Sequence, residues 1–316
     1  MCLFRWCILY HLDLVRVCFF ELYSLKDKIM RVFAAFCFVV LLWSTTPLAI
    51  KWSTEPGYLF GAASRMVIGL ACMLLVLLLS RRKLPLTRVA WLTYLAIAVQ
   101  IYGAMLAVYW GAQFIPSGWI SVIFGLTPLM TALLAAIYRQ ERSLGFYKLM
   151  AYAAGIAGLF VMFGSALEIS QNAVRGITAI LLAAFIQAAS SVWIKRIDAK
   201  LPAICQVSGG LLLAVPAYLL TWILIDGHWP ENLSPYSLGA IIYLGVIATT
   251  IGFALYFYVL THLPATKVAL ITLLTPVLSL YLGRIINHEP LTNQVILGSA
   301  LILLALLLHQ LGGIKS

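Results

Sequence analysis

A few polar residues of this sequence lie inside long apolar runs, where they could bind a ligand. Thr127-Pro128 and Thr275-Pro276 are two copies of one dipeptide, each in the middle of an apolar run, and Arg65 lies in another run. A proline inside a helix removes one hydrogen bond and displaces the carbonyl four residues earlier. Each pair therefore offers a hydroxyl and a freed carbonyl, and Arg65 offers a permanent charge with planar donors. Such groups suit the binding of a small polar molecule.

The two Thr-Pro pairs belong to a longer internal repeat. Residues 116–141 and 264–289 match at a constant spacing of 148 residues, with the same proline at the start, Leu-Thr-Pro in the middle and a glutamate at the end. The other positions are mostly apolar in both copies. Apolar matches arise easily by chance, whereas a shared Pro, Thr-Pro and Glu do not, so the repeat indicates two related halves.

The composition indicates an integral membrane protein. The chain has 316 residues, of which 63% are hydrophobic and 10% charged, and its mean hydropathy is +1.02; a soluble domain is about 25% charged. Backbone groups in hydrocarbon must be satisfied internally, so apolar runs of membrane length are helices. A large soluble helical core is excluded because the runs lack polar faces. Ten runs are expected, at about 32–50, 57–79, 89–110, 116–137, 144–164, 174–194, 202–225, 237–260, 264–285 and 292–311.

Five of these runs fall in each half, at about 30–165 and 172–312. Because five is odd, the second half must enter the membrane upside down relative to the first. The predicted fold is therefore an all-α integral membrane protein with ten transmembrane helices, arranged as two inverted five-helix repeats. Inverted repeats place a central cavity between the halves and let it open to either side. Residues 1–29 are apolar but interrupted by charges, and we expect them to be an extension upstream of a natural start at Met30.

Basic residues are concentrated in the loops on one side of this arrangement. The loops between runs 2 and 3, 4 and 5, and 6 and 7 hold most of them, which predicts that these loops and both termini are cytoplasmic. The formal charge of +11 is thus assigned to membrane topology, and no nucleic-acid partner is expected. The basic residues of these loops are Arg81, Arg82, Lys83, Arg88, Arg139, Arg142, Lys148, Lys195, Arg196 and Lys200.

The order of these features resembles the EamA-type ten-helix permeases of the drug/metabolite transporter superfamily. The resemblance covers about residues 30–312 and rests on Trp43-Ser44 followed by Pro47 and Lys51, on Arg65, and on the Pro…Thr-Pro…Glu pattern of runs 4 and 9. The sixth run lacks the Trp-Ser-x-x-Pro form, so the second half is expected to open differently. The resemblance implies a multi-pass exporter of small metabolites such as amino acids in the bacterial inner (plasma) membrane.

Arg65 lies eight residues after Gly57, about 12 Å along a helix from its outer boundary. A cation at that depth is costly and suggests a functional site. It could bind a substrate carboxylate, or it could join two helices by bonding backbone carbonyls; both readings remain open. Pro128, roughly 18 Å after Pro116, is near the bilayer centre, and the Thr-Pro pairs either line a cavity or only shape the packing.

Other residues are candidates for the cavity wall or its ends. Lys51 is read either as part of a vestibule or as a side chain reaching the interface. Glu141 and Glu289 are either solvated helix ends or parts of a gate or proton site. The small residues of run 5, among them Gly158, are expected to allow a close internal helix contact. The complete set of substrate-binding or cavity candidates is Trp43, Lys51, Arg65, Tyr102, Thr127, Pro128, Gln187, Tyr256, Thr275 and Pro276.

The absence of certain residue types narrows the function. The sequence places no Asp or Glu in the middle of any run, which disfavours a pump that exchanges protons for cationic drugs. A membrane-embedded enzyme would need a paired acidic motif, a His/Asp cluster or a nucleophile beside a base, and the sequence has none. Six scattered cysteines predict no metal site, and no cofactor or nucleotide-binding loop is expected.

We therefore predict a secondary transporter whose partners are a small-molecule substrate and the lipid bilayer. A multidrug or nucleotide-sugar carrier of the same architecture is the alternative within this class, and a scaffold or channel subunit lies outside it. Substrate identity, direction of transport, proton coupling and oligomeric state stay open.

Overall fold

The computed structural model describes residues 30–138, 145–169, 171–263, 265–268 and 270–314, and within these ranges every regular element is a helix. The prediction of an all-α protein is confirmed. In chain order the elements are the N-terminal helix Met30–Ser53, α2 Tyr58–Leu79, α3 Arg88–Val99, η1 Gln100–Ala104, α4 Met105–Ala112, α5 Ser117–Phe124, α6 Thr127–Ile137, α7 Phe146–Ile169, α8 Gln171–Ile197, α9 Ala203–Ile225, α10 Pro235–Ile242, η2 Tyr243–Ile251, α11 Gly252–His262, α12 Ala265–Val268, α13 Leu270–Ile286 and α14 Asn293–Ile314.

These elements form ten spans, as the apolar runs predict. Nine helical stretches among the described residues are long and apolar enough to cross a bilayer, and α13 is a tenth, shorter apolar helix. Several spans consist of more than one element: α3, η1 and α4 make the third, α5 and α6 the fourth, and α10, η2 and α11 the eighth. The chain is therefore a multi-pass membrane protein.

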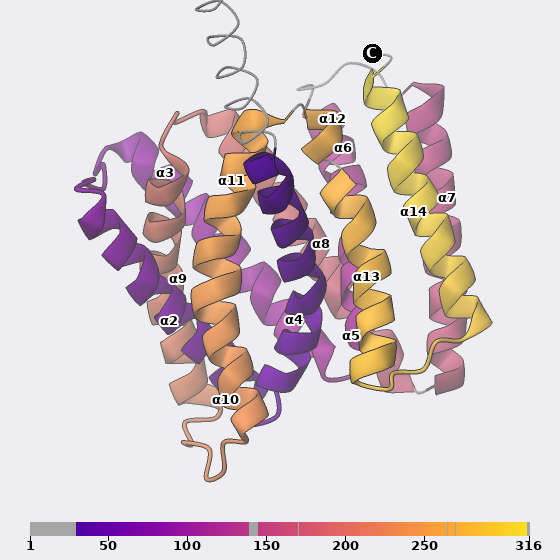
Figure 1. Cartoon of the computed structure of the whole chain (residues 1–316), viewed down its shortest axis with the longest axis horizontal. Coiled ribbons are helices and arrows are strands. Elements are labelled where there is room, and N and C mark those ends of the chain that lie inside the picture. Colours follow the sequence, from indigo (N-terminus) through magenta and orange to yellow (C-terminus); the bar gives the residue numbers. More distant parts are fainter. Residues whose placement is uncertain (1–29, 139–144, 170, 264, 269, 315–316) are drawn as a thin grey trace, which may run out of the picture.

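The spans pack in pairs that relate one half to the other. Spans 2 and 7 contact each other as α2 and α9, spans 4 and 9 as α5 and α13, and spans 5 and 10 as α7 and α14. In Figure 1 the pair α7 and α14 forms one edge of the molecule, and α2, α3 and α9 form the other. The contact of α3 with α9 is matched by that of η2 with α2, so the pairing is symmetric under exchange of the halves. With five spans in each half, the second repeat is inverted relative to the first.

The pair α7 and α14 is held close by glycines. A Cβ atom added at Gly158 of α7 would lie 2.7 Å from the carbonyl oxygen of Gly298 on α14, too close for any side chain. The prediction that the small residues of run 5 make an internal helix contact is confirmed.

The two Thr-Pro pairs are accommodated in different ways. The fourth span is interrupted, since α5 ends at Phe124 and α6 begins at Thr127; the Thr127 hydroxyl donates a hydrogen bond of 2.6 Å to the Phe124 carbonyl. The carbonyl that we expected Pro128 to release thus has a partner inside its own span. In the ninth span α13 continues through Pro276, and the Thr275 hydroxyl donates to the Ile271 carbonyl at 2.6 Å.

Two π-helical segments interrupt the third and eighth spans at equivalent positions. η1 covers residues 100–104. Adding the repeat spacing of 148 gives residues 248–252, which overlap η2, the segment that covers residues 243–251. A π segment widens the helix, leaves its hydrogen bonds irregular and is common at functional sites. The symmetric pair of π segments therefore indicates a candidate functional region.

Candidate functional site

Arg65 is buried in the middle of α2, with 8% of its surface exposed. Its Nε and Nη1 atoms are shielded from solvent, and neither has a hydrogen-bond partner among the described residues. Of the two readings of Arg65, the one in which these atoms bond backbone carbonyls has no support here. A buried cation with unpaired donors is energetically costly, and it attracts an anion.

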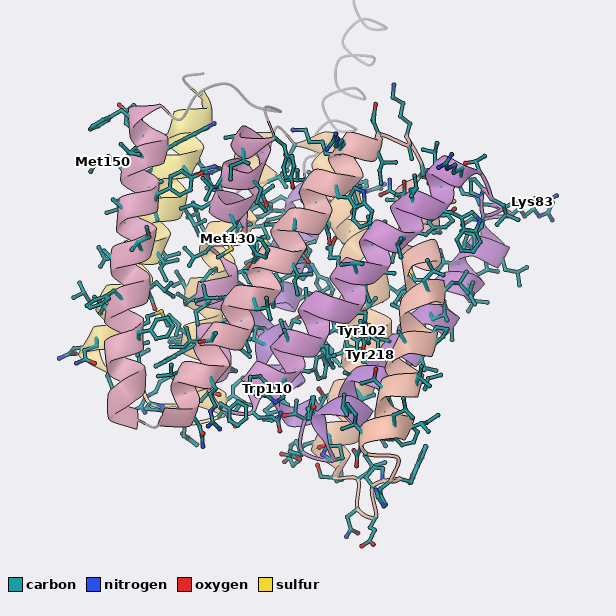
Figure 2. All side chains as sticks on the ribbon, turned by 180° about the vertical axis from the view of Figure 1, so that it is seen from behind. Lys83, Tyr102, Trp110, Met130, Met150 and Tyr218 are labelled. Atoms are coloured by element: carbon teal, nitrogen blue, oxygen red, sulfur yellow. The ribbon has the colours of Figure 1, made fainter. Side chains whose placement is uncertain are left out.

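Three tyrosines lie in spans that pack beside α2. Tyr109 of α4 and Tyr218 of α9 are fully buried on helices that contact α2, and they share an apolar core with Met66, the residue after Arg65. Figure 2 shows Tyr102 and Tyr218 next to each other in the interior, with ring centroids 5.1 Å apart. The Tyr109 hydroxyl is buried and has no hydrogen-bond partner among the described residues. Spans 2, 3 and 7 thus meet at an arginine and a tyrosine hydroxyl that both lack partners.

The other two tyrosines are held by hydrogen bonds. The Tyr218 hydroxyl donates to the carbonyls of Ile101 and Tyr102, at 2.8 and 3.1 Å, and both carbonyls belong to η1. The hydroxyls of Tyr102 and Thr221 are 2.6 Å apart and bond each other. The second π segment reaches the same place, since a Cβ atom on Gly245 of η2 would lie 3.1 Å from the Arg65 carbonyl oxygen. The second π segment therefore packs on the Arg65 backbone, and the first is bonded to Tyr218.

A second polar cluster, which we call the Glu289 network, joins the two halves at one end of the molecule. The Glu289 carboxylate is 8% exposed and accepts hydrogen bonds from the Ser117 hydroxyl and the Asn287 amide, each at 2.9 Å. The Gly118 N–H at the start of α5 points to the same carboxylate from 3.5 Å. The reading of Glu289 as a solvated helix end is therefore wrong, because this carboxylate is enclosed by span 4.

Lys51 and Gly283 complete the Glu289 network. The Lys51 ammonium is attracted by Glu289 and donates a hydrogen bond of 2.7 Å to the Ile115 carbonyl, just before span 4. Gly283 leaves room for the carboxylate, since a Cβ atom there would lie 2.5 Å from Glu289 Oε2. The network therefore ties the N-terminal helix and α5 of the first repeat to the end of α13 in the second.

Span 4 is more buried next to Glu289 than in its other half, which runs toward the end where Lys83 lies (Figure 2). Six of the eight residues of α5 are buried, whereas α6 buries three of its eleven. The backbones of α5 and α13 nearly touch, because a Cβ atom on Gly118 would lie 2.8 Å from Leu280 Cα. Ser279 adds bonds within this layer, accepting from Ser121 at 2.9 Å and donating to the Ser44 carbonyl at 2.8 Å. Spans 1, 4 and 9 are thus closed together at the Glu289 end.

A mostly apolar cavity of about 370 Å³ lies between the N-terminal helix and the eighth span. Its polar boundary includes Thr45 and Tyr243, whose hydroxyls bond each other at 2.5 Å. The residues that line it are Thr45, Leu48, Ala49, Trp52, Pro235, Tyr236, Gly239, Ala240, Tyr243 and Ile286.

The remaining candidates are distributed over the molecule. Trp43 and Tyr256 form an aromatic pair between the N-terminal helix and α11, with centroids 4.9 Å apart. Gln187 is half-buried on α8. Glu141 lies outside the described residues, as do residues 1–29. Of the predicted cavity residues, Tyr102 packs against Tyr218 of the Arg65 cluster, whereas Trp43 and Tyr256 pack against each other.

Several residues of both clusters were missed from the sequence. Tyr109, Tyr218, Ser117 and Gly283 are not among the candidates that the sequence indicates. The repeat spacing could have connected η1 with η2, but tyrosines are too frequent here for their spacing to indicate a cluster. Among the described residues no group of three or more His, Cys, Asp or Glu side chains could hold a metal ion.

Comparison with known proteins agrees with this architecture. The model of the EamA-like transporter family matches residues 30–164 and again residues 174–309. The chain is 28% identical over 269 residues to the "Uncharacterized transporter YoaV" of Bacillus subtilis (strain 168), covering 84% of this chain and 91% of that protein. It is 26% identical over 286 residues to the "Probable amino-acid metabolite efflux pump" of Salmonella typhimurium (strain LT2), covering 87% and 93%.

A solved crystal structure superposes on the chain with a TM-score of 0.62. It is 22% identical in sequence, and the match covers 90% of this chain and 98% of that one. This likeness shows the fold alone.

Proposed function

Because the chain belongs to the EamA-like transporter family, whose model matches both of its halves, we propose that it is a secondary active exporter of small polar metabolites such as amino acids. It is a membrane transporter, and its relatives are named as transporters and efflux pumps, not as enzymes. In our proposal the two repeats move relative to each other, so that a central site faces one side of the membrane and then the other.

The observation that carries this proposal is that side-chain hydrogen bonds between the two repeats close the Glu289 end. The Glu289 network bonds the second repeat to the start of α5, and the half of span 4 next to it is largely buried. The other half of the same span, α6, is more exposed. A transporter that works by alternating access closes one end of the molecule at a time. Hydrogen bonds between side chains of the two repeats suit such a closure, because they can form and break without unfolding either repeat.

Two observations support a small polar metabolite as the cargo. Two relatives, from Salmonella typhimurium and Escherichia coli, carry the name "Probable amino-acid metabolite efflux pump". Arg65 is a buried cation with two unpaired donor atoms, an environment that repels cationic drugs and attracts anionic or zwitterionic molecules.

The distribution of basic residues supports an orientation. Arg81, Arg82 and Lys83 follow α2, Lys195 and Arg196 end α8, and the contact between Cys205 and the Lys83 carbonyl joins these two loops at one end. By the positive-inside rule this Lys83 end faces the cytoplasm. We place the protein in the bacterial inner membrane with both termini cytoplasmic and with the Glu289 end outside.

Counterflow in liposomes tests the exporter proposal. The purified full chain is reconstituted into liposomes loaded with an unlabelled amino acid, and uptake of the same radiolabelled amino acid is followed with and without a pH gradient. We expect saturable counterflow for at least one amino acid, absent from protein-free liposomes. If a hydrophobic cation such as tetraphenylphosphonium moves and no amino acid does, the multidrug alternative is correct.

A further inference from the structure

We propose that Arg65 and Tyr109 form the binding site for a carboxylate group of the transported molecule. The proposal rests on the proposed function in one respect, namely that the molecule bound at this site is the one that the protein transports. It narrows the cargo to molecules that carry a carboxylate, either as zwitterions or as simple monoanions.

The guanidinium of Arg65 is poised to donate. Its Nε and Nη1 atoms are buried without partners among the described residues, and each shares one edge of the planar group with Nη2. A carboxylate can bond either edge through two nearly parallel N–H groups. A structural arginine at this depth would have its N–H groups bonded to carbonyls or paired with an acid.

Tyr109 is the second donor, because the other hydroxyls of this cluster already make hydrogen bonds within the protein. The proton of the Tyr218 hydroxyl is committed to two carbonyls of η1, and the hydroxyls of Tyr102 and Thr221 bond each other. The Tyr109 hydroxyl is buried and has no hydrogen-bond partner in the part of the chain that the structure describes. It is therefore the hydroxyl of this cluster that is free to donate to an incoming oxygen.

The charge of the site matches one carboxylate. Among the described residues, Arg65 is the only lysine or arginine that is buried. One positive charge neutralises one carboxylate, whereas a phosphate dianion would bring an uncompensated charge into a buried place.

Ligand-dependent thermal unfolding of the purified full chain in detergent tests the site without requiring transport. The twenty common amino acids are screened, and each one that raises Tm is titrated beside its carboxamide and beside the carboxylic acid that lacks its amino group. We expect the carboxylic acid to retain binding and the carboxamide to bind about 10- to 100-fold more weakly, the range for losing hydrogen bonds to a charged group.

Variants then assign the effect to Arg65. We expect Arg65→Gln to weaken amino-acid binding about 10- to 100-fold and Tyr109→Phe about 2- to 10-fold. Arg88→Gln is the matched control, since Arg88 is an exposed arginine at the start of α3, and its binding should equal that of the wild type. Ligand-free Arg65→Met should melt at or above the temperature of the wild type, because it removes an unpaired buried charge.

Three results would overturn the proposal. One is that no amino acid and no amine-free acid raises the Tm of the wild type; another is that carboxamides bind as tightly as the acids. The third is that ligand-free Arg65→Met melts at a lower temperature, which would make Arg65 a structural residue. If amino acids bind in an Arg65-dependent way but no counterflow is seen, the exporter proposal is rejected and the binding site stands. If the Arg65→Gln protein shows undiminished counterflow, the binding site is rejected and the exporter proposal stands.

Discussion

At the scale of single residues, Arg65 and Glu289, the two charged side chains buried among the described residues, have opposite surroundings. Glu289 is surrounded by donors from Ser117 and Asn287 and attracted by Lys51, so its charge is compensated within the protein. Arg65 is equally buried, but its Nε and Nη1 atoms have no such compensation among the described residues. A charge that the protein itself satisfies suits a closure, and a charge left unsatisfied suits a binding site.

Weakening the Glu289 network should loosen the closed end. In a cysteine-free background, Ser121→Cys reports on the buried α5–α13 contact, where Ser121 bonds Ser279. We expect Glu289→Gln to raise the rate at which a membrane-impermeant maleimide labels this cysteine about tenfold, because hydrogen bonds to a charged acceptor are worth roughly 1.5–3 kcal/mol.

A pair of glycines supplies the control for this experiment. Gly283→Ala places a methyl group 2.5 Å from Glu289 Oε2 and should act like Glu289→Gln, whereas a Cβ atom on Gly239 meets nothing within 4 Å, so Gly239→Ala should leave labelling unchanged. Equal labelling of Ser121→Cys with and without Glu289→Gln would mean that Glu289 does not hold this end closed.

At the scale of elements, the irregular spans are those that pack on the helices of the Arg65 cluster or build the Glu289 network, since η1 packs on α9, η2 on α2 and α5 on α13. Span 4 is interrupted between Phe124 and Thr127, and spans 3 and 8 contain the π segments. By contrast, α7 and α14 at the edge are continuous and packed glycine to glycine. The fold thus combines a rigid edge pair with irregular central spans, where the backbone can rearrange.

The rigid edge pair can be tested by two substitutions in one helix. Gly158→Ala puts a Cβ atom 2.7 Å from the Gly298 carbonyl oxygen, which forces α7 and α14 apart, and we expect it to cost about 1–3 kcal/mol of stability. Gly164→Ala in the same helix meets nothing within 4 Å and should be neutral or stabilising by up to about 1 kcal/mol. Thermal unfolding of both variants is the measurement, and a stable Gly158→Ala protein would contradict this packing.

Local properties of the chain were predictable from the sequence, and contacts between distant residues were not. Ten apolar runs predict ten spans because the bilayer sets the length of a helix. The two prolines predict the same disturbance in spans 4 and 9, but only span 4 is interrupted, since α13 continues through Pro276. The sequence could not decide whether Glu289 is a solvated helix end or part of a gate, because its hydrogen-bond partner Ser117 is 172 residues away. The π segments were missed because no residue type specifies them.

At the scale of the whole molecule, counterpart spans pair across the two halves, and the Glu289 end is closed. We interpret this as one of two related arrangements. The halves share a fold and face each other symmetrically, yet the Glu289 network joins them at one end. Exchanging the conformations of the two repeats would open the Glu289 end and close the Lys83 end around the same centre. In the orientation proposed here, that exchange carries a molecule bound near Arg65 from the cytoplasmic side to the outside.

Distances across both ends of one protein test this alternation most directly. Spin labels are placed in a cysteine-free background at Gln113 and Leu291 for the Glu289 end, and at Ile137 and Lys267 for the opposite end, all described positions that are exposed. Double electron–electron resonance is recorded in lipid nanodiscs with and without the amino acid that raises Tm most. We expect the Gln113–Leu291 distance to lengthen in part of the population while the Ile137–Lys267 distance shortens in the same proportion. Two distances that stay fixed, or that lengthen together, would contradict alternating access.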